Sequence, residues 1–309
     1  MSSLDPDVRD RLLRRIGLAS APAPDAVGLR QVHRAFVSRV PYENLAIQLG
    51  ETEALDPVRL VQRVLLGGRG GYCFEVNSVL HVLLESLGFA VERRQGIVGA
   101  REAHARGEPT NHMALVVDTP DEGRFIAEAG WGEGPLDPLA LVEGPVTSGV
   151  FERRIARERE GWWLTQHEFG ATAGFHFADA PATLDDFAAH HLRLSTAPDS
   201  VFVAGLIVQR PFDDRILTLR SRTLALDGPG VYERRILPNR EAFASVLQER
   251  FEIDVAALGS DRLERLWQNA VRQHDARHRY PNWVYTGARA WRARRRRAKG
   301  RARPTRASA

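Results

Sequence analysis

The segment Arg69–Asn77 reads Arg-Gly-Gly-Tyr-Cys-Phe-Glu-Val-Asn and contains Cys73, the single cysteine of the 309-residue chain. A lone thiol cannot form an internal disulfide, so a structural bridge is excluded. The glycines before Cys73 predict a turn, and the apolar residues between Phe74 and Leu87 recur at helical spacing. Cys73 is therefore expected at a helix N-terminus, where free N–H groups and the helix dipole favour the thiolate.

This position suits a nucleophile, because the thiolate is the reactive form of cysteine and a glycine turn lets substrate atoms approach the backbone. The alternative is a buried cysteine that acts as a small apolar residue. The glycine turn and the helix start together favour the nucleophile.

The composition is that of an ordinary globular protein, with 43% apolar and 27% charged residues. No apolar run approaches the length of a membrane span. The first residues lack the basic and apolar regions of a signal peptide. With one cysteine and no export signal, the protein is expected in the reducing cytoplasm. The absence of any Cys-x-x-Cys pair argues against a zinc site.

The net charge of +4 hides an uneven distribution. Ten basic residues and no acid lie between Arg289 and Ala309, and subtracting them leaves −6 for the rest of the chain. Residues 288–309 are therefore predicted to be a disordered basic tail. Such a tail can touch phosphate groups nonspecifically, but no specific nucleic-acid partner and no membrane is expected.

Helical patterns dominate the first ninety residues, short apolar strands follow, and the C-terminal part is mixed. Helices are predicted at 5–17, 27–40, 56–67, 74–87, 240–251 and 258–273, and strands at 90–98, 113–118, 124–128, 162–168, 201–209 and 216–225. Asp-Pro pairs at 5–6 and 56–57 predict an N-cap followed by proline in the first turn. This order of elements indicates an α+β fold with antiparallel strands.

A cysteine nucleophile needs a base, and that base needs an acceptor that orients it. His112 directly precedes the apolar strand 113–118, and Glu128 ends the next predicted strand. If the two strands form a hairpin, Glu128 lies opposite His112 and can accept its Nδ1 proton. Cys73, His112 and Glu128 are therefore the candidate catalytic residues.

Several ordered motifs give the chain a strong resemblance to the arylamine N-acetyltransferases over roughly residues 5–280. The first motif is Arg-Val-Pro-Tyr-Glu-Asn-Leu at 39–45, and the second is the nucleophile segment 69–77. Asn-His-Met at 111–113, Ile-Ala-Glu-Ala-Gly-Trp-Gly at 126–132 and Ser-Thr-Ala-Pro-Asp-Ser-Val-Phe at 195–202 resemble later segments of the family.

The resemblance implies a helical bundle at 1–90 that carries the nucleophile, a β-barrel-like domain at 91–210 and an α/β lid at 211–287, with a core similar to cysteine peptidases. It also implies ping-pong transfer of an acetyl group from acetyl-CoA, through a cysteine thioester, to the nitrogen of an arylamine or arylhydrazine. Acetyl-CoA is a cosubstrate, and no tightly bound cofactor is implied. A monomer or a weak homo-oligomer is expected.

Two residues depart from the family pattern. Glu128 stands where the family has aspartate, and it adds one methylene to the arm of the carboxylate. Trp131 replaces the usual phenylalanine and is expected to reshape the acceptor pocket. The acceptor amine and the acyl chain preference are left open.

Other residues take expected roles from the resemblance. Arg69 and Glu43 are expected to pair and to hold the glycine turn beside the nucleophile. The Gly-rich stretch with Gly130, Trp131 and Gly132, together with Phe202 from the later motif, is expected to bind CoA, because glycines let phosphates approach backbone N–H groups.

Three other functions remain open from the sequence. A macrolactam-forming amide synthase has the same motifs and takes its acyl chain from a carrier protein. A cysteine hydrolase uses the same triad with water. A degenerate, ligand-binding protein is suggested by Glu128, although such a protein has no need to keep Cys73 and His112.

Overall fold

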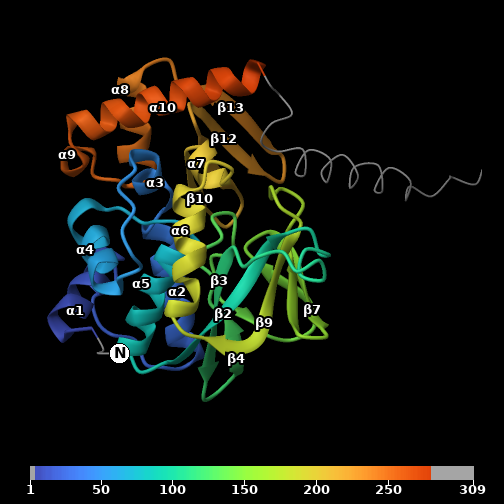
Figure 1. Cartoon of the computed structure of the whole chain (residues 1–309). Coiled ribbons are helices and arrows are strands. Elements are labelled where there is room, and N and C mark those ends of the chain that lie inside the picture. The colour runs from blue at the N-terminus through green and yellow to red at the C-terminus, as the bar shows by residue number, and fades with distance from the viewer. Residues whose placement is uncertain (1–3, 280–309) are drawn as a thin grey trace, which may run out of the picture.

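Helix α5 (Cys73–Ser86) runs through the middle of the protein (Figure 1). The computed structural model describes residues 4–279. Every residue of α5 from Cys73 to Leu84 is buried, because the N-terminal helices cover one side and strands β2 and β3 cover the other. A helix enclosed in this way holds its first residue rigidly, and that residue is Cys73.

The N-terminal helices are α1 (Pro6–Arg15), α2 (Ala26–Arg39), α3 (Leu45–Leu49) and α4 (Pro57–Gly67). The predicted Asp-Pro caps are confirmed. The Asp5 carboxylate accepts from the N–H of Asp7 at 2.9 Å, and Asp56 accepts from the N–H of Val58 at 2.9 Å. These bonds satisfy donors that the first helical turn leaves unpaired.

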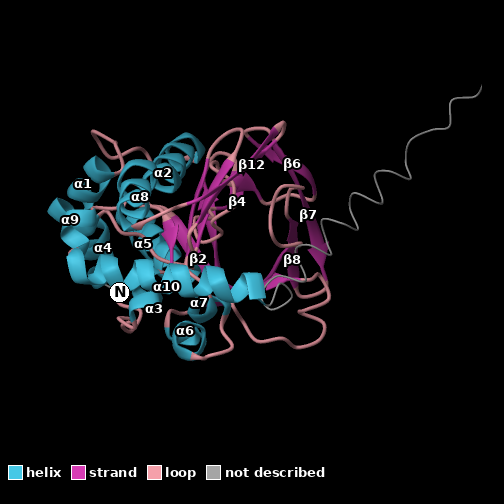
Figure 2. Cartoon of the chain, turned by 90° about the horizontal axis from the view of Figure 1, so that it is seen from above, coloured by secondary structure: helices cyan, strands magenta, loops and turns pink. Residues whose placement is uncertain are grey.

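An eight-stranded antiparallel sheet packs beside the helices in the order β5-β4-β3-β2-β9-β8-β7-β6. Its edge strands β5 and β6 are neighbours, so the sheet curls into a nearly closed barrel (Figure 2). The strands are β2 (Ala90–Gly99), β3 (His112–Thr119), β4 (Gly123–Ile126), β5 (Leu139–Ala140), β6 (Gly144–Ser148), β7 (Phe151–Glu158), β8 (Gly161–Thr165) and β9 (Gly174–Ala182). Helix α5 contacts this sheet at β2 and β3.

A second, five-stranded antiparallel sheet forms the C-terminal part in the order β1-β10-β11-β12-β13. Its strands are β1 (Tyr42–Glu43), β10 (Ile207–Pro211), β11 (Ile216–Arg220), β12 (Thr223–Gly228) and β13 (Val231–Ile236). The remaining elements are η1 (Asp185–Phe187), α6 (Ala188–Thr196), α7 (Val201–Ala204), α8 (Arg240–Ser245), η2 (Val246–Arg250), α9 (Val255–Leu258) and α10 (Ser260–Arg279). Because β1 belongs to the N-terminal motif at 39–45, this sheet ties that motif to the C-terminal part.

The α+β class is confirmed, but two predicted strands are wrong in detail. Residues 201–204 form helix α7, whose cap is the Ser200 hydroxyl accepting from the N–H of Phe202 at 3.2 Å. The predicted strand 216–225 is two strands, β11 and β12, joined at Ser221, which has a φ of 51°. Serine is not a residue that marks a left-handed turn in a sequence, so the apolar pattern of 216–225 predicts one uninterrupted strand. The predicted tail at 288–309 lies outside the described residues.

Candidate active site

The turn before Cys73 depends on two glycines. A Cβ on Gly70 would lie 1.8 Å from the carbonyl oxygen of Pro41, and one on Gly71 would lie 2.5 Å from Oε2 of Glu75. The clash at Gly70 is with the main chain of Pro41, so only glycine fits there, whereas a side chain at residue 71 would displace Glu75. These close approaches bring the 39–45 motif against the nucleophile segment.

Arg69 and Glu43 hold the same junction, and their predicted pairing is confirmed. Arg69 Nε donates to Glu43 Oε1 at 2.9 Å, and Arg69 Nη2 donates to Oε2 at 3.3 Å. Glu43 is 1% exposed. Burial alone would raise the pKa of Glu43, but the charges of Arg69 and Arg63 and the hydrogen bonds lower it below its ordinary value. Glu43 is therefore a buried carboxylate whose ionised form is stabilised by Arg69.

Replacing Arg69 with leucine is expected to lower the free energy of unfolding by about 3–5 kcal/mol, because it leaves the Glu43 charge buried and without its main partner. Urea unfolding at pH 7 measures this loss. The loss should shrink as the pH falls from 7, because burial without Arg69 raises the pKa of Glu43 in the variant and protonation then removes the buried charge. The double variant Arg69→Leu/Glu43→Leu is the control and should recover much of the stability. A loss that is independent of pH would contradict this account.

Cys73 is the first residue of α5 and is 2% exposed. Its Sγ–H donates to the carbonyl oxygen of Asn111 at 3.5 Å. Burial, and next the charge of Glu128, raise the pKa of the Cys73 thiol far above its ordinary value, although the N–H groups of Phe74 and Met113 oppose this. Burial therefore opposes the thiolate that the helix N-terminus is expected to favour, because desolvation disfavours the charged form. A thiolate here requires a neighbouring cation.

His112 and Glu128 are both buried and hydrogen-bonded to one another. His112 Nε2 lies 2.9 Å from Glu128 Oε2, and the two side chains are 1% and 0% exposed. The predicted contact through Nδ1 is wrong. Strand β4 ends at Ile126, and the chain after it brings Glu128 to the Nε2 side of the ring. Nδ1 is then the ring nitrogen that is available to Cys73. The Sγ of Cys73 is hydrogen-bonded to the carbonyl of Asn111, the residue before His112.

Asn77 joins the cysteine helix to the carboxylate. Its Nδ2 donates to Glu128 Oε1 at 2.9 Å and to the carbonyl of Met113 at 2.6 Å, and its Oδ1 accepts from the N–H of Ala129 at 3.1 Å. The role of Asn77 is not evident from the sequence motifs alone. The spacing does point to it, because Asn77 is four residues after Cys73 and residues four apart share one face of a helix.

Three of the predicted CoA-binding residues, Gly130, Trp131 and Gly132, pack closely against other parts of the protein. A Cβ on Gly130 would lie 2.8 Å from Cα of Cys73, and one on Gly132 would lie 2.7 Å from the Tyr42 ring. Trp131 is buried and packs edge-on against Phe175, with ring centroids 5.0 Å apart. Packing within the protein thus explains both glycines without a ligand.

Phe202, the fourth of these residues, packs against the residue before Cys73. Its ring centroid is 4.9 Å from that of Tyr72, the residue before the cysteine. Its carbonyl oxygen accepts from Asn44 Nδ2 at 2.8 Å, which ties helix α7 to the 39–45 motif. Binding of CoA by these four residues stays a prediction.

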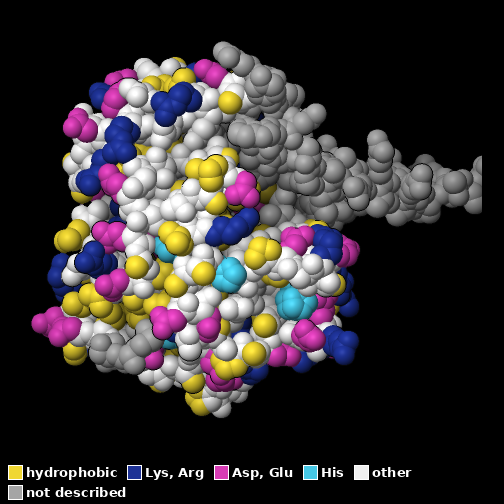
Figure 3. Space-filling model, in the orientation of Figure 1, with side chains coloured by type: hydrophobic (Ala, Val, Ile, Leu, Met, Phe, Trp, Pro, Cys, Tyr) yellow, Lys and Arg dark blue, Asp and Glu magenta, His cyan; other side chains and the backbone are white. Residues whose placement is uncertain are grey.

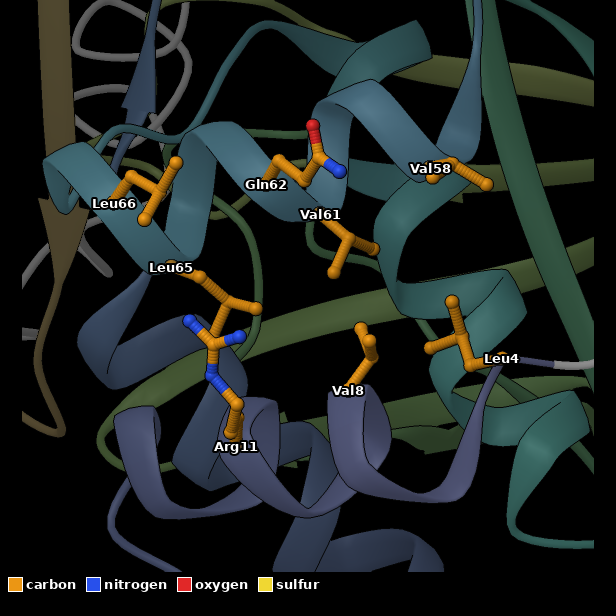
Figure 4. A pocket seen from close by; sticks show the side chains of 8 residues that line it. All are labelled: Leu4, Val8, Arg11, Val58, Val61, Gln62, Leu65 and Leu66. Atoms are coloured by element: carbon orange, nitrogen blue, oxygen red, sulfur yellow. The ribbon is translucent and has the colours of Figure 1, made fainter.

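An apolar pocket of about 280 Å³ lies between α1 and α4 (Figure 4). Its lining is Leu4, Val8, Arg11, Val58, Val61, Gln62, Leu65 and Leu66, and none of the candidate catalytic residues is among them. Within residues 4–279, no group of three or more His, Cys, Asp or Glu side chains is arranged to hold a metal ion. Cys73, His112 and Glu128 remain the candidate catalytic residues.

A cysteine at the start of a buried helix, a histidine on the adjacent strand β3 and a carboxylate in the segment after β4 form a core like that of the cysteine peptidases. A family model described as N-acetyltransferase matches residues 26–259. The arylamine N-acetyltransferase of Mycolicibacterium smegmatis is 33% identical over 252 residues, which cover 80% of this chain and 92% of that protein. The chain belongs to the arylamine N-acetyltransferase family.

Solved structures agree with this assignment. The structure of the M. smegmatis arylamine N-acetyltransferase has a TM-score of 0.74 and 31% identity, and the match covers 83% of this chain and 96% of that one. The Mycobacterium marinum arylamine N-acetyltransferase in complex with CoA has a TM-score of 0.75 and 27% identity, with 84% and 97% covered. The predicted fold and family are thus confirmed.

Proposed function

We propose that Cys73, His112 and Glu128 carry out the acetyl transfer of this family in two half-reactions. In the first, the Sγ proton of Cys73 passes to Nδ1 of His112, and the thiolate attacks the carbonyl carbon of acetyl-CoA. The bond to the CoA sulfur breaks, and CoA leaves with the proton that His112 returns. In the second, the nitrogen of an arylamine or arylhydrazine attacks the thioester, its proton passes through His112, and the Cys73 thiol is restored.

The observation that carries this proposal is the 2.9 Å hydrogen bond between His112 Nε2 and Glu128 Oε2. A buried carboxylate stabilises the imidazolium that forms when His112 takes the proton. It also fixes the ring, so that Nδ1 is the nitrogen that exchanges protons. Because burial raises the pKa of Cys73, this imidazolium is the cation that the thiolate needs.

Mass spectrometry of the intact protein after mixing with acetyl-CoA tests the proposal. We expect a gain of one acetyl group on a peptide that contains Cys73, and its loss when an arylamine is added. An unmodified Cys73, or an acetyl group that only water removes, would contradict the transfer to an amine.

The comparisons do not favour the alternative activities. The relatives described above are named as arylamine N-acetyltransferases, and one of them is a complex with CoA. An amide synthase using a carrier protein and a cysteine hydrolase therefore have less support. The acceptor of this protein is an arylamine or an arylhydrazine.

Location, oligomeric state and the division into units belong to the same proposal. The protein acts in the cytoplasm as a monomer or weak homo-oligomer, in units at 1–90, 91–210 and 211–287. Among residues 4–279, no helix has both the length and the apolar character to cross a membrane. On the face shown in Figure 3, basic and acidic side chains are interspersed.

A further inference from the structure

His33 lies on the buried face of α2 and is 0% exposed. Its Nδ1 is 2.8 Å from the carbonyl oxygen of Leu136, and its Nε2 is 2.8 Å from the backbone nitrogen of Glu128. A carbonyl can only accept, so Nδ1 carries the proton. A backbone N–H can only donate, so Nε2 is bare. The two contacts therefore specify a neutral ring in one tautomer.

The ring of His33 accepts a hydrogen bond from the backbone N–H of Glu128, for which the sheet supplies no acceptor. Strand β4 ends at Ile126, and the N–H of Ala127 still bonds the carbonyl of Leu115 at 3.0 Å. Glu128 follows directly, and its N–H points to His33 instead of to a strand. A buried N–H without an acceptor is costly, so His33 determines where this part of the main chain can lie.

Glu128 is thus held at both ends. Helix α2 fixes its main chain through His33, and α5 fixes its carboxylate through Asn77. The side chain that spans these two points ends at Nε2 of His112. A shift of the main chain at residue 128 would move the carboxylate away from that ring.

We propose that His33 is a positioning residue that sets the distance between the carboxylate of Glu128 and the ring of His112. This inference rests on the proposed roles of Cys73, His112 and Glu128. Burial lowers the pKa of His33, which keeps its ring neutral. The neutral form is required, because an imidazolium would direct an N–H at the N–H of Glu128.

Two substitutions separate the two contacts of the ring. Asparagine places its amide near the position of Nδ1, so His33→Asn can keep the bond to Leu136 but does not reach Glu128. Glutamine places its amide near the position of Nε2, so His33→Gln can accept from the N–H of Glu128 but loses the bond to Leu136. Both are polar amides and both leave space in the core, which makes each the control for the other.

The readout is the rate of Cys73 alkylation by iodoacetamide between pH 5 and 9, which needs neither acetyl-CoA nor an amine. His33→Asn is expected to lower the rate near pH 6 by about 10- to 100-fold, the range typical of lost outer-shell contacts. His33→Gln should stay within about threefold of the parent protein. Circular dichroism and thermal unfolding verify that both variants fold. An equal loss in both variants, or no loss in either, would overturn the proposal.

A second measurement does not depend on the variants folding. In the unsubstituted protein with ¹⁵N-labelled histidine, NMR at pH 7 should show His33 protonated at Nδ1 and bare at Nε2. The opposite tautomer would overturn the proposal. If Cys73 alkylates rapidly near pH 6 but is not acetylated by acetyl-CoA, the proposed function fails while the test of His33 still stands.

Discussion

Replacing Cys73 with serine or alanine is expected to lower acetyl transfer by about 10⁴-fold or more, the size of effect seen when a covalent nucleophile is removed. Alanine has no atom that can carry the acetyl group. Serine has one, but its hydroxyl is a far weaker nucleophile at neutral pH. The measurement is the rate of CoA release from acetyl-CoA in the presence of an arylamine.

The control for this prediction is Ser78→Ala, on the same helix. Ser78 is buried, and its hydroxyl donates to the carbonyl oxygen of Phe74 at 2.6 Å. Its removal perturbs α5 without removing the thiol, so the rate should stay near that of the parent protein. Substantial turnover by a folded Cys73→Ala variant would show that transfer does not pass through a thioester.

The second large effect is expected for Glu128→Gln. The carboxylate accepts from Asn77 Nδ2 through one oxygen and contacts His112 Nε2 through the other. Glutamine has a single oxygen, so its NH₂ group must face one of these nitrogens, and it carries no charge to stabilise the imidazolium. We expect both acetyl transfer and Cys73 alkylation near pH 6 to fall by about 100-fold or more.

The pH profile of Cys73 alkylation shows in which pH range the glutamine variant should lose reactivity. The raised pKa of Cys73 means that the thiol alone does not ionise near pH 6, so reactivity there must come from proton transfer to His112. The glutamine variant should therefore lose reactivity in the acid range and regain it only as the pH rises toward the pKa of the isolated thiol. If it alkylates like the parent protein across the acid range, Glu128 is not part of a triad.

Glu128→Asp is the matched variant, since it keeps the charge and shortens the arm by one methylene. With the main chain held by His33, the carboxylate cannot fully follow, and a displacement of about 1 Å can cost on the order of 100-fold in rate. Some of this is recoverable by small backbone shifts. We therefore expect intermediate activity, well above that of the glutamine variant.

The sequence alone was enough to identify the nucleophile segment and the family. Glycines, an N-terminal helix position and a unique cysteine are local features, because each depends on neighbours within a few residues. The same kind of local pattern predicted the Asp-Pro caps of α1 and α4. The family motifs predicted the pairing of Arg69 with Glu43. The strand character of 90–98 and 113–118 followed from their apolar residues.

The pKa of Cys73 and the ring nitrogen of His112 that contacts Glu128 are set by the tertiary structure alone. Burial of Cys73 among α5, β3 and the loop after β4 raises its pKa, and no local pattern reports the depth at which a helix start will lie. The approach of Glu128 to Nε2 instead of Nδ1 depends on where β4 ends. The helical turn at 201–204 is held by Asn44, more than 150 residues away in the chain.

His33 is the clearest case of this division. In the sequence it is one histidine on an apolar helix face, 95 residues before Glu128, and nothing near it suggests a role in the site. The fold brings its ring to the backbone N–H of Glu128, which donates to His33 and not to a strand. Local sequence determines which residues are able to do chemistry, whereas long-range packing determines their protonation and the distances between them, because desolvation and hydrogen-bond geometry depend on every element around the site.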